Sequence, residues 1–210
     1  MKTILFDLDG TLIQTPKMIK ESFRYVFKKY LPNVVLDETT VDNFLGHTLW
    51  ETFGKYVDDV AQIETMVADY RQYSESLIKG GIDPYPNAKM ILQYLRKKGC
   101  QIGVVTSKIK KAAVSHLHLT GLLEDVDHVI GYEDVENHKP HPDPLLKAIE
   151  IFQANKNKAI YIGDHENDIK AAKNAGIQSC AVTYSSRLRE MLLEQPDYVI
   201  DDLKNLKDLL

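Results

Sequence analysis

Two aspartates, Asp7 and Asp9, follow a short apolar run near the start of the chain, in the stretch ILFDLDGTL (residues 4–12). Two carboxylates this close together repel each other, so their spacing calls for a cation or a reacting group that compensates the charge. Taken alone, the stretch is equally compatible with an ordinary strand exit, because Asp and Gly are common turn residues. Other parts of the chain must decide between these interpretations.

A second acidic strand end is expected in AIYIGDHENDI (residues 159–169), where a glycine and Asp164 follow an apolar run. Asp168 comes four residues later, in the expected first turn of a helix, and one helical turn brings it back beneath Asp164. Both acids could simply cap this helix and complement its dipole. Two acidic strand ends in one sheet make that simpler interpretation less favourable.

Hydroxyl and amine groups occur in two further segments. Thr106 and Ser107 end the run QIGVVTS (residues 101–107) and precede Lys108. Hydroxyls and free backbone amides at a strand-to-helix turn suit phosphate oxygens, although a helix cap is the commoner use. Lys139 lies in NHKPHPDP (residues 137–144), where Pro140 fixes one backbone angle directly after the lysine, which suits an aimed cation.

These four segments together meet the requirements of phosphoester chemistry. A phosphoester resists nucleophiles because it is negatively charged, so a site needs a carboxylate nucleophile, a neutralising cation, hydrogen bonds to the oxygens and a proton donor. Hard carboxylate oxygens favour Mg²⁺, which takes few carboxylates and keeps several waters. The predicted reaction is therefore a Mg²⁺-dependent phosphoryl transfer.

The motifs DLDGT, VVTS, HKP and GDHEND resemble, in order and separation, the four motifs of the haloacid dehalogenase superfamily. The resemblance spans nearly the whole chain. An insertion after the first motif resembles the helical cap of the phosphoglycolate phosphatase and pyrophosphatase-like branch, and GHTLWETF (residues 46–53) is similar to the cap loop of that branch. The resemblance implies hydrolysis of a small phosphorylated metabolite, such as phosphoglycolate, or of pyrophosphate.

Catalytic roles follow from the resemblance by position. It implies that Asp7 is the nucleophile that forms an aspartyl-phosphate, and that Asp9 protonates the leaving group and then activates water. It further implies that Thr106 and Lys139 hold the transferring phosphoryl oxygens, with Lys139 also restraining the charge of Asp7.

Metal and substrate contacts are implied in the same way. Mg²⁺ would be bound by the Asp7 carboxylate, the Asp9 backbone carbonyl and Asp164, with Asp168 in a supporting position. Ser107 stands where the family commonly has asparagine, which puts a direct substrate contact by this residue in question. The candidate substrate-binding residues are Ser107, Thr48 and Gly10.

The elements that must position these residues are predicted from periodicity. From Gln101 onward, apolar β-rich runs alternate with helical patterns. This alternation predicts an α/β fold with a Rossmann-like parallel sheet, helices on both faces, and ligands at the carboxyl ends of the strands. The expected strands are QIGVVT, VDHVIG, AIYIG, SCAV and DYVI.

Two further helices are expected around this sheet. Asn87 is a candidate N-cap for a helix that Gly99 ends. Its apolar face would consist of Ala88, Ile91, Leu92 and Leu95. The closing stretch DDLKNLKDLL (residues 201–210) has the pattern of a short amphipathic helix.

An inserted α-helical cap domain is predicted at residues 15–81, with residues 1–14 and 82–210 forming the catalytic core. Apolar residues follow helical spacing here, and flexible joints near residues 12–16 and 80–86 would allow the cap to move as a lid. His47, Thr48 and Trp50 are expected to influence substrate choice, although Thr48 could merely cap a helix. The basic residues Lys17, Lys20, Arg24 and Lys28 are interpreted as a solvated face rather than as an anion-attracting surface.

Composition places the chain among ordinary soluble proteins. Of its 210 residues, 44% are hydrophobic and 27% charged, and the formal net charge of −4 lacks the basic excess expected of a nucleic-acid-binding protein. No apolar run approaches the roughly 18 residues of a membrane span, and Asp7 interrupts the N-terminus before a signal-peptide core. Cys100 and Cys180 are interpreted as buried thiols in a reducing compartment, which predicts a cytoplasmic protein. The oligomeric state stays open.

Two alternative functions remain. A sugar-phosphate mutase would use similar motifs, but more basic contacts would be expected around the cap loop than GHTLWETF supplies. A phospho-accepting signalling module also combines acids, Mg²⁺, a hydroxyl and a lysine on an α/β sheet, but its acceptor acid lies on a middle strand and it has no cap. Dehalogenation is disfavoured because it requires neither Asp9 as an acid nor a metal site. The seven histidines are left unassigned.

Overall fold

The computed structural model describes residues 2–209, which divide into two compact units. The core unit contains the segments up to Gln14 and from Asp83 onward, and the inserted unit is Thr15–Ile82. The chain therefore leaves the core unit once, after its first strand, and returns to it once.

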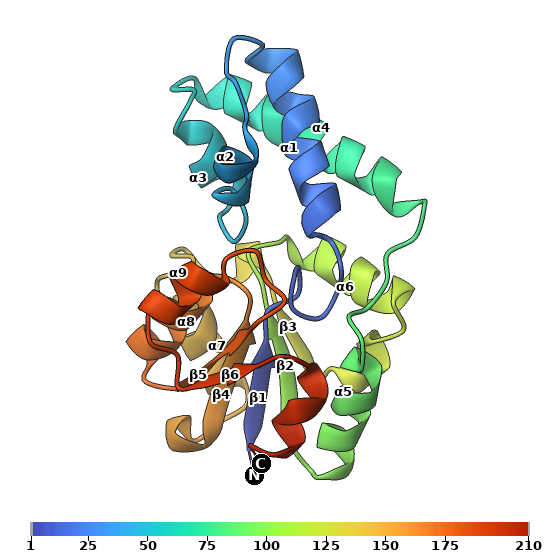
Figure 1. The fold of residues 1–210 in the computed structure, drawn as a ribbon, viewed down its shortest axis with the longest axis vertical. Helices are drawn as coiled ribbons and strands as arrows, with labels where there is room; N and C mark the ends of the chain where they lie inside the picture. Colours follow the sequence, from blue (N-terminus) through green and yellow to red (C-terminus); the bar gives the residue numbers. More distant parts are fainter. Residues whose placement is uncertain (1, 210) are drawn as a thin grey trace. The chain divides into compact units, whose positions relative to one another are not determined.

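The core unit is built on six parallel strands in the order β3-β2-β1-β4-β5-β6 (Figure 1). Phe6 is in register with Val104 on one side and with Ile162 on the other, so the chain leaves β1, β2 and β4 at the same edge of the sheet. The predicted Rossmann-like α/β fold is confirmed. The strands are β1 (Thr3–Phe6), β2 (Gln101–Val105), β3 (His128–Ile130), β4 (Ala159–Gly163), β5 (Gln178–Val182) and β6 (Tyr198–Ile200).

Helices cover both faces of this sheet, with α5 and α6 on one face and α7 and α8 on the other (Figure 1). Leu5 and Tyr161 of the central strands are fully buried in a cluster with Leu145 of α7 and Ala172 of α8. Burial on both faces explains why the strands appear in the sequence as continuous apolar runs. The helices are α5 (Ala88–Lys97), α6 (Lys110–Leu119), α7 (Asp143–Ile151), α8 (Glu166–Ala175) and α9 (Leu188–Leu193).

Short 3₁₀ helices complete the core unit: η1 (Leu123–Asp125), η2 (Tyr132–Asp134), η3 (Lys156–Lys158) and η4 (Leu203–Lys207). The closing amphipathic segment is thus a 3₁₀ helix over Leu203–Lys207, with Asp202 accepting a hydrogen bond from the Lys204 amide at its start. Asn87 occupies the N-cap position of α5, as predicted, but its side chain forms no capping hydrogen bond. Asn87 has a left-handed backbone with φ of 63°, and its amide donates to the Asp202 carboxylate instead.

The inserted unit contains helices only: α1 (Pro16–Tyr30), α2 (Glu38–Asp42), α3 (Leu49–Gly54) and α4 (Val60–Ile78). Their apolar faces enclose an aromatic cluster in which Phe23 contacts Phe44, Phe53 and Tyr70, with ring centroids 4.8–5.7 Å apart. This cluster explains the helical spacing of apolar residues in the sequence, because the unit buries a hydrophobic core of its own.

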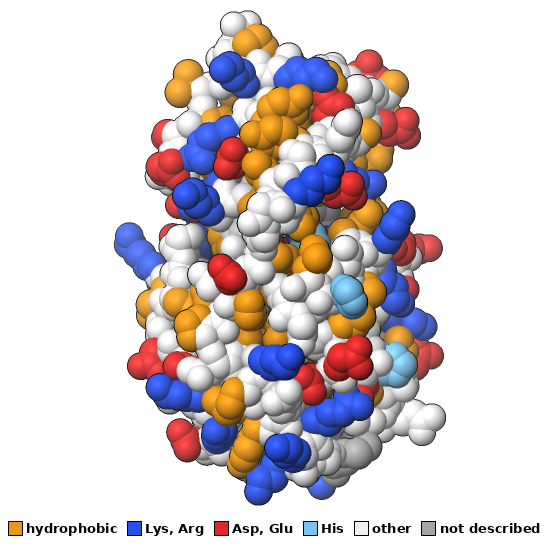
Figure 2. Space-filling model, turned by 90° about the vertical axis from the view of Figure 1, so that its right-hand side faces the viewer, with side chains coloured by type: hydrophobic (Ala, Val, Ile, Leu, Met, Phe, Trp, Pro, Cys, Tyr) orange, Lys and Arg blue, Asp and Glu red, His pale blue; other side chains and the backbone are white. Residues whose placement is uncertain are grey.

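The basic face of α1 is partly neutralised inside the inserted unit. Lys20 forms an ion pair with Asp42, and Arg24 forms one with Glu38. Among the described residues on the face drawn in Figure 2, Lys and Arg side chains are interspersed with Asp and Glu. Such mixing is typical of a solvated protein surface.

Two findings concern membrane-spanning helices and the state of the cysteines. No helix within residues 2–209 is long and apolar enough to cross a membrane. Both cysteines are free thiols, but only Cys180 is buried, so the prediction that both are buried is wrong for the half-buried Cys100. The cytoplasmic location stays a prediction.

The aromatic cluster predicts a local stability effect. Phe23→Ala should lower the free energy of unfolding of the inserted unit by about 3–5 kcal/mol, because it removes a fully buried ring from the cluster. Urea unfolding followed by the fluorescence of Trp50, the chain's single tryptophan and part of this unit, measures the effect. The control Val35→Ala, at a residue 88% exposed, should change it by less than about 0.5 kcal/mol. Equal effects would contradict the placement of Phe23.

Candidate active site

The site is built around Asp7, the first residue after the central strand β1. Its backbone amide donates to the Ile162 carbonyl at 2.8 Å, which extends the pairing with β4 by one residue. The side chain is buried, with 6% of the residue exposed. Because β1 lies between β2 and β4, groups that follow each of these strands can converge on the Asp7 carboxylate.

Lys139 is the cation of the site, although it comes from a loop far away in the sequence. Its Nζ donates to Asp7 Oδ1 at 2.8 Å, to Asp168 Oδ1 at 2.6 Å and to the Tyr161 hydroxyl at 2.8 Å. Burial alone would lower the pKa of this ammonium, but the Asp168 and Asp7 carboxylates raise it well above its usual value. Lys139 is therefore a charged group that donates hydrogen bonds to three acceptors and joins two carboxylates.

Tyr161 was not identified from the sequence, and it supports this lysine. Its hydroxyl accepts from Lys139 and donates to the Val105 carbonyl at 2.7 Å, so the phenol connects β4 with β2. Burial raises the pKa of the phenol well above its usual value, which keeps it protonated as a donor. A single phenol in an otherwise aliphatic buried strand was the signal available in the sequence, because a buried hydroxyl needs partners.

Asp164 follows β4 and lies close against the turn after β1. Thr11 Oγ1 donates to Asp164 Oδ1 at 3.3 Å, and Gly10 has a φ of +88°. A Cβ atom on residue 10 would lie 2.0 Å from Asp164 Oδ2. Glycine is therefore required at position 10 both by its backbone conformation and by the closeness of the carboxylate.

Asp168 has two functions in the structure. Its Oδ1 accepts from Lys139, and its Oδ2 accepts from the His165 backbone amide at 3.0 Å, at the N-terminus of α8. The capping interpretation of this acid is thus correct, but it describes only one of the two oxygens. The prediction that Asp168 lies near Asp164 within one helical turn agrees with this position.

Three buried carboxylates, those of Asp7, Asp164 and Asp168, have oxygens that all lie within 4.8 Å of one another. Burial raises the pKa of Asp7 from 3.8 to about 7, against the lowering effect of Lys139. Burial and the Asp7 charge raise the pKa of Asp164 well above its usual value. Throughout residues 2–209, no Lys or Arg forms an ion pair with Asp164. A divalent cation bound by oxygen ligands fits this excess of negative charge.

Asp9 lies outside this carboxylate cluster and has a different partner. Lys108 Nζ donates to Asp9 Oδ1 at 2.8 Å, and the same nitrogen lies 3.2 Å from His116 Nδ1. The Asp9 side chain is 15% exposed. The metal contact predicted for Asp9 was its backbone carbonyl, so its absence from the carboxylate cluster leaves that prediction untested.

The hydroxyls that follow β2 differ in their surroundings. Thr106 is buried, its amide donates to the Ile130 carbonyl at 3.0 Å, and its Oγ1 accepts from the Lys108 amide at 3.2 Å. Ser107 is half-buried, and its hydroxyl forms no hydrogen bond with any described residue. The local structure therefore fixes Thr106 more firmly than Ser107.

The candidate substrate residues of the inserted unit have roles within that unit. Thr48 Oγ1 accepts from the Glu51 amide at 3.1 Å and caps α3, as the simpler interpretation of this threonine stated. His47 Nδ1 lies 2.7 Å from Glu51 Oε1. Trp50 packs against the aromatic cluster. Their influence on substrate choice stays a prediction.

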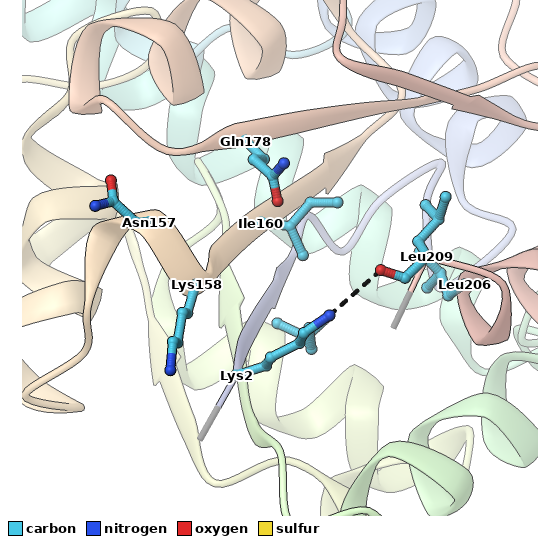
Figure 3. A pocket seen from close by; sticks show the side chains of 8 residues that line it. Lys2, Asn157, Lys158, Ile160, Gln178, Leu206 and Leu209 are labelled. Carbon is cyan, nitrogen blue, oxygen red and sulfur yellow. Dashed lines mark hydrogen bonds between the residues drawn. The ribbon is translucent and has the colours of Figure 1, made fainter.

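A separate small cavity of about 90 Å³ lies at the opposite, amino ends of the strands (Figure 3). Lys2, Lys158 and Gln178 are among the residues that line it, and Lys2 Nζ donates to the Leu209 carbonyl at 3.4 Å. Its volume is well below the roughly 300–1,000 Å³ of ordinary small-molecule sites. It is also at the end of the sheet away from the carboxylates, so it takes no part in the candidate active site.

Comparisons with known proteins agree with this geometry. Residues 4–182 match the family model described as haloacid dehalogenase-like hydrolase. The chain is 35% identical over 211 residues to the pyrophosphatase PpaX of Bacillus cereus strain G9842, covering 100% of this chain and 96% of the relative. The family match is thus consistent with the carboxylate cluster at the ends of the strands.

Two solved structures are also similar to this chain over nearly its whole length. A haloacid dehalogenase-like hydrolase from Streptococcus pneumoniae is similar, with a TM-score of 0.84 and 26% identity over 100% of this chain and 98% of that chain. A predicted phosphoglycolate phosphatase from Haemophilus somnus is similar with a TM-score of 0.88 and 25% identity, over 100% of this chain and 97% of that chain.

The raised pKa of Asp7 predicts the pH dependence of stability in metal-free protein. A carboxyl whose pKa is 3.8 unfolded and about 7 folded binds its proton more tightly when folded, so its contribution to stability is lost as pH rises from about 4 to about 7. The free energy of unfolding, measured in chelator across this range, should fall by a few kcal/mol. Asp7→Asn should reduce the fall, because the amide does not ionise.

The matched control for this experiment is Asp143→Asn. Asp143 is partly exposed to solvent. The hydrogen bond from Asn137 and the nearby His141 lower its pKa, so this carboxyl titrates below the pH range of the experiment. Asp143→Asn should leave the fall in place. An unchanged profile in Asp7→Asn would mean that Asp7 does not titrate in this range.

Proposed function

Because the chain belongs to the haloacid dehalogenase-like hydrolase family, we propose that it is a Mg²⁺-dependent phosphohydrolase in which Asp7 receives the phosphoryl group. The observation that carries the proposal is the Asp7 carboxylate itself, buried at the end of the central strand and held by Lys139 beside Asp164. A bound cation or a reacting phosphoryl group would compensate the cost of burying three carboxylates beside one ammonium.

In the first half-reaction, a lone pair on an Asp7 carboxylate oxygen forms a bond to phosphorus. The bond from phosphorus to the leaving oxygen breaks, its electron pair goes to that oxygen, and Asp9 supplies the proton. Lys139 favours the ionised, nucleophilic form of Asp7, because its ammonium lies 2.8 Å from Oδ1 and lowers the pKa of this carboxyl. Thr106 is proposed to donate to a phosphoryl oxygen.

In the second half-reaction, water attacks the phosphorus of the aspartyl-phosphate. Asp9, now a carboxylate, accepts a proton from that water, and the bond between phosphorus and the Asp7 oxygen breaks to regenerate Asp7 and release phosphate. The partial exposure of the Asp9 side chain supports this role, because a group that exchanges protons with leaving group and water must be reachable by both.

The residues proposed to hold Mg²⁺ are Asp7, the backbone carbonyl of Asp9 and Asp164, with Asp168 orienting the site through Lys139. The surroundings of Asp7 and Asp164 support this assignment: burial and, to a smaller extent, the neighbouring carboxylates raise both pKa values, and a bound cation would offset both effects. When bound, the cation supplies charge neutralisation for the phosphoryl oxygens. Gly10 supports the site by allowing Asp164 to approach the turn after β1.

The proposed substrate is a small phosphorylated molecule, with pyrophosphate and phosphoglycolate as the first candidates. Pyrophosphate is supported by the 35% identity to the Bacillus cereus pyrophosphatase over the whole chain, and phosphoglycolate by the structural similarity to the Haemophilus somnus protein. The residues of the core site would contact the phosphoryl group that both candidates share, so they do not discriminate between them.

Steady-state turnover tests the function. Purified protein with Mg²⁺ should hydrolyse pyrophosphate or phosphoglycolate with a higher kcat/KM than hexose phosphates, nucleotides or phosphoproteins. Asp7→Asn should lower kcat by more than about 10³-fold, because the amide cannot serve as nucleophile. Asp143→Asn, which changes a carboxylate outside the site, should have nearly wild-type kcat. Turnover in Asp7→Asn close to that of wild type would refute the mechanism, and interconversion of hexose phosphates without phosphate release would indicate a mutase.

Metal removal tests the cation assignment. Chelation should abolish turnover, Mg²⁺ should restore it, and Ca²⁺ should inhibit, because its larger and looser coordination shell misplaces the reacting groups. Asp164→Asn should raise the Mg²⁺ concentration required for half-maximal activity by at least about tenfold or abolish activity. Full turnover in chelator would contradict the assignment.

A further inference from the structure

Lys108, Asp9 and His116 form a row of contacts that the motif assignments leave unexplained. Lys108 Nζ donates to Asp9 Oδ1 at 2.8 Å and lies 3.2 Å from His116 Nδ1. Lys108 directly follows the hydroxyls after β2, whereas His116 is on α6, eight residues further along. The three side chains thus connect the turn after β1 to a helix on the face of the sheet.

The backbone of Lys108 is fixed on both sides. Its amide donates to Thr106 Oγ1 at 3.2 Å, and its carbonyl accepts from the Tyr132 amide at 2.9 Å. The lysine side chain itself is only 16% exposed. A lysine on a flexible four-carbon stem usually samples many positions. Here the backbone is already held in place, and the contacts of Nζ with Asp9 and His116 fix the direction of the Lys108 side chain.

His116 has the protonation state that this arrangement requires. An ammonium has donors only, so Nδ1 must accept the hydrogen bond and the ring proton must be on Nε2. Burial and the Lys108 charge lower the pKa of His116 to about 4, so the ring is neutral near pH 7. The histidine is 3% exposed, and it accepts the hydrogen bond inside the core unit.

We propose that His116 is a positioning residue that holds the Lys108 ammonium against Asp9 and thereby orients the Asp9 carboxyl for proton transfer to the leaving group. This inference rests on the proposed function, because it assigns the origin of the Asp9 orientation in that same reaction. Neither residue contacts the phosphoryl group in this role. Lys108 acts on Asp9, and His116 acts only through Lys108.

Lys108 is placed to stabilise the negative charge that develops on Asp9 in the first half-reaction. When the bond from phosphorus to the leaving oxygen breaks, Asp9 gives up its proton and becomes a carboxylate. The Lys108 ammonium lies next to that new negative charge and stabilises it. A hydrogen bond at Oδ1 also stops the carboxyl from rotating, which keeps the proton aligned with the leaving oxygen.

Loss of this orientation has a specific kinetic signature. A leaving group that is a weak base departs as an anion and needs little help from an acid, whereas a strongly basic leaving group needs the proton. A misaligned Asp9 should therefore slow substrates with basic leaving groups more than others. A general loss of folded or correctly packed enzyme would slow all substrates by the same factor.

The test compares kcat/KM for phenyl phosphate and 4-nitrophenyl phosphate, because kcat/KM reports on phosphoryl transfer to Asp7. His116→Leu, which removes the acceptor, should lower kcat/KM on the order of tenfold or more for phenyl phosphate, but less than about threefold for 4-nitrophenyl phosphate. His116→Asn is the matched variant, since its carboxamide oxygen takes the place of Nδ1 as acceptor. It should restore most of the phenyl phosphate activity. Equal losses on both substrates, or none, would overturn the proposal.

A double-mutant cycle separates positioning from packing. Lys108→Met should reproduce the leaving-group dependence of His116→Leu, and adding His116→Leu to Lys108→Met should cause no further change in the ratio of the two kcat/KM values. A further change in that ratio would mean that His116 acts other than through Lys108, and the proposal would be wrong.

A measurement independent of turnover covers the case in which the leucine variant folds poorly. In full-length protein labelled with ¹⁵N-histidine, the NMR spectrum near pH 7 should show His116 as the neutral tautomer with its proton on Nε2. Lys108→Met should shift the His116 Nδ1 resonance. A proton on Nδ1 in wild-type protein would overturn the proposed contact.

Failure of the proposed function would look different. If wild-type protein hydrolyses neither a phosphate ester nor pyrophosphate, or if Asp7→Asn retains turnover, the proposed function fails, and the role of His116 in proton transfer fails with it. If wild-type protein is active, Asp7→Asn is inactive and His116→Leu affects both aryl phosphates equally, only the positioning role fails.

Discussion

The buried ammonium of Lys139 is the interaction on which the site depends, because it joins groups that arrive from separate parts of the sheet. Asp7 follows β1, Asp168 lies in the first turn of α8 after β4, and Tyr161 lies within β4 and contacts β2 through its hydroxyl. Removal of one partner from such a network leaves an uncompensated buried charge. The positions of β1, β2 and β4 and the geometry of the site are therefore coupled through one side chain.

This cation does not balance the charge of the site, and the imbalance links the fold to the reaction. Lys139 contacts Asp7 and Asp168, whereas Asp164 is held by a neutral donor, Thr11. Burial and mutual repulsion raise the pKa values of Asp7 and Asp164, so metal-free protein carries an electrostatic cost there. The cation proposed for this site would relieve the repulsion on binding, and the relief would contribute to its binding energy.

The sequence predicted the sheet and the convergence of its strand ends, because continuous apolar runs and acidic strand exits are local patterns. It did not predict the contacts of Tyr161, Lys108 or His116, which depend on how distant segments pack. Asn87 shows the limit even for local rules. A residue type that usually caps a helix donates to Asp202 instead, because its left-handed backbone turns the side chain away from the helix start and tertiary packing supplies another partner.

Asp7 and Asp9 are two residues apart, yet their environments differ in the way that the nucleophile role proposed for Asp7 and the acid–base role proposed for Asp9 require. Asp7 is buried, and its lysine partner is itself buried and bound to a second carboxylate and a phenol. Asp9 is more exposed, and its lysine partner is held by a neutral histidine, which adds no competing negative charge. Lys108 forms an ion pair with Asp9, whereas Lys139 forms ion pairs with both Asp7 and Asp168. Two aspartates with separate cations can change their charges at different steps of one reaction, and each ammonium offsets part of the repulsion between them, although the Asp9 charge still raises the pKa of Asp7.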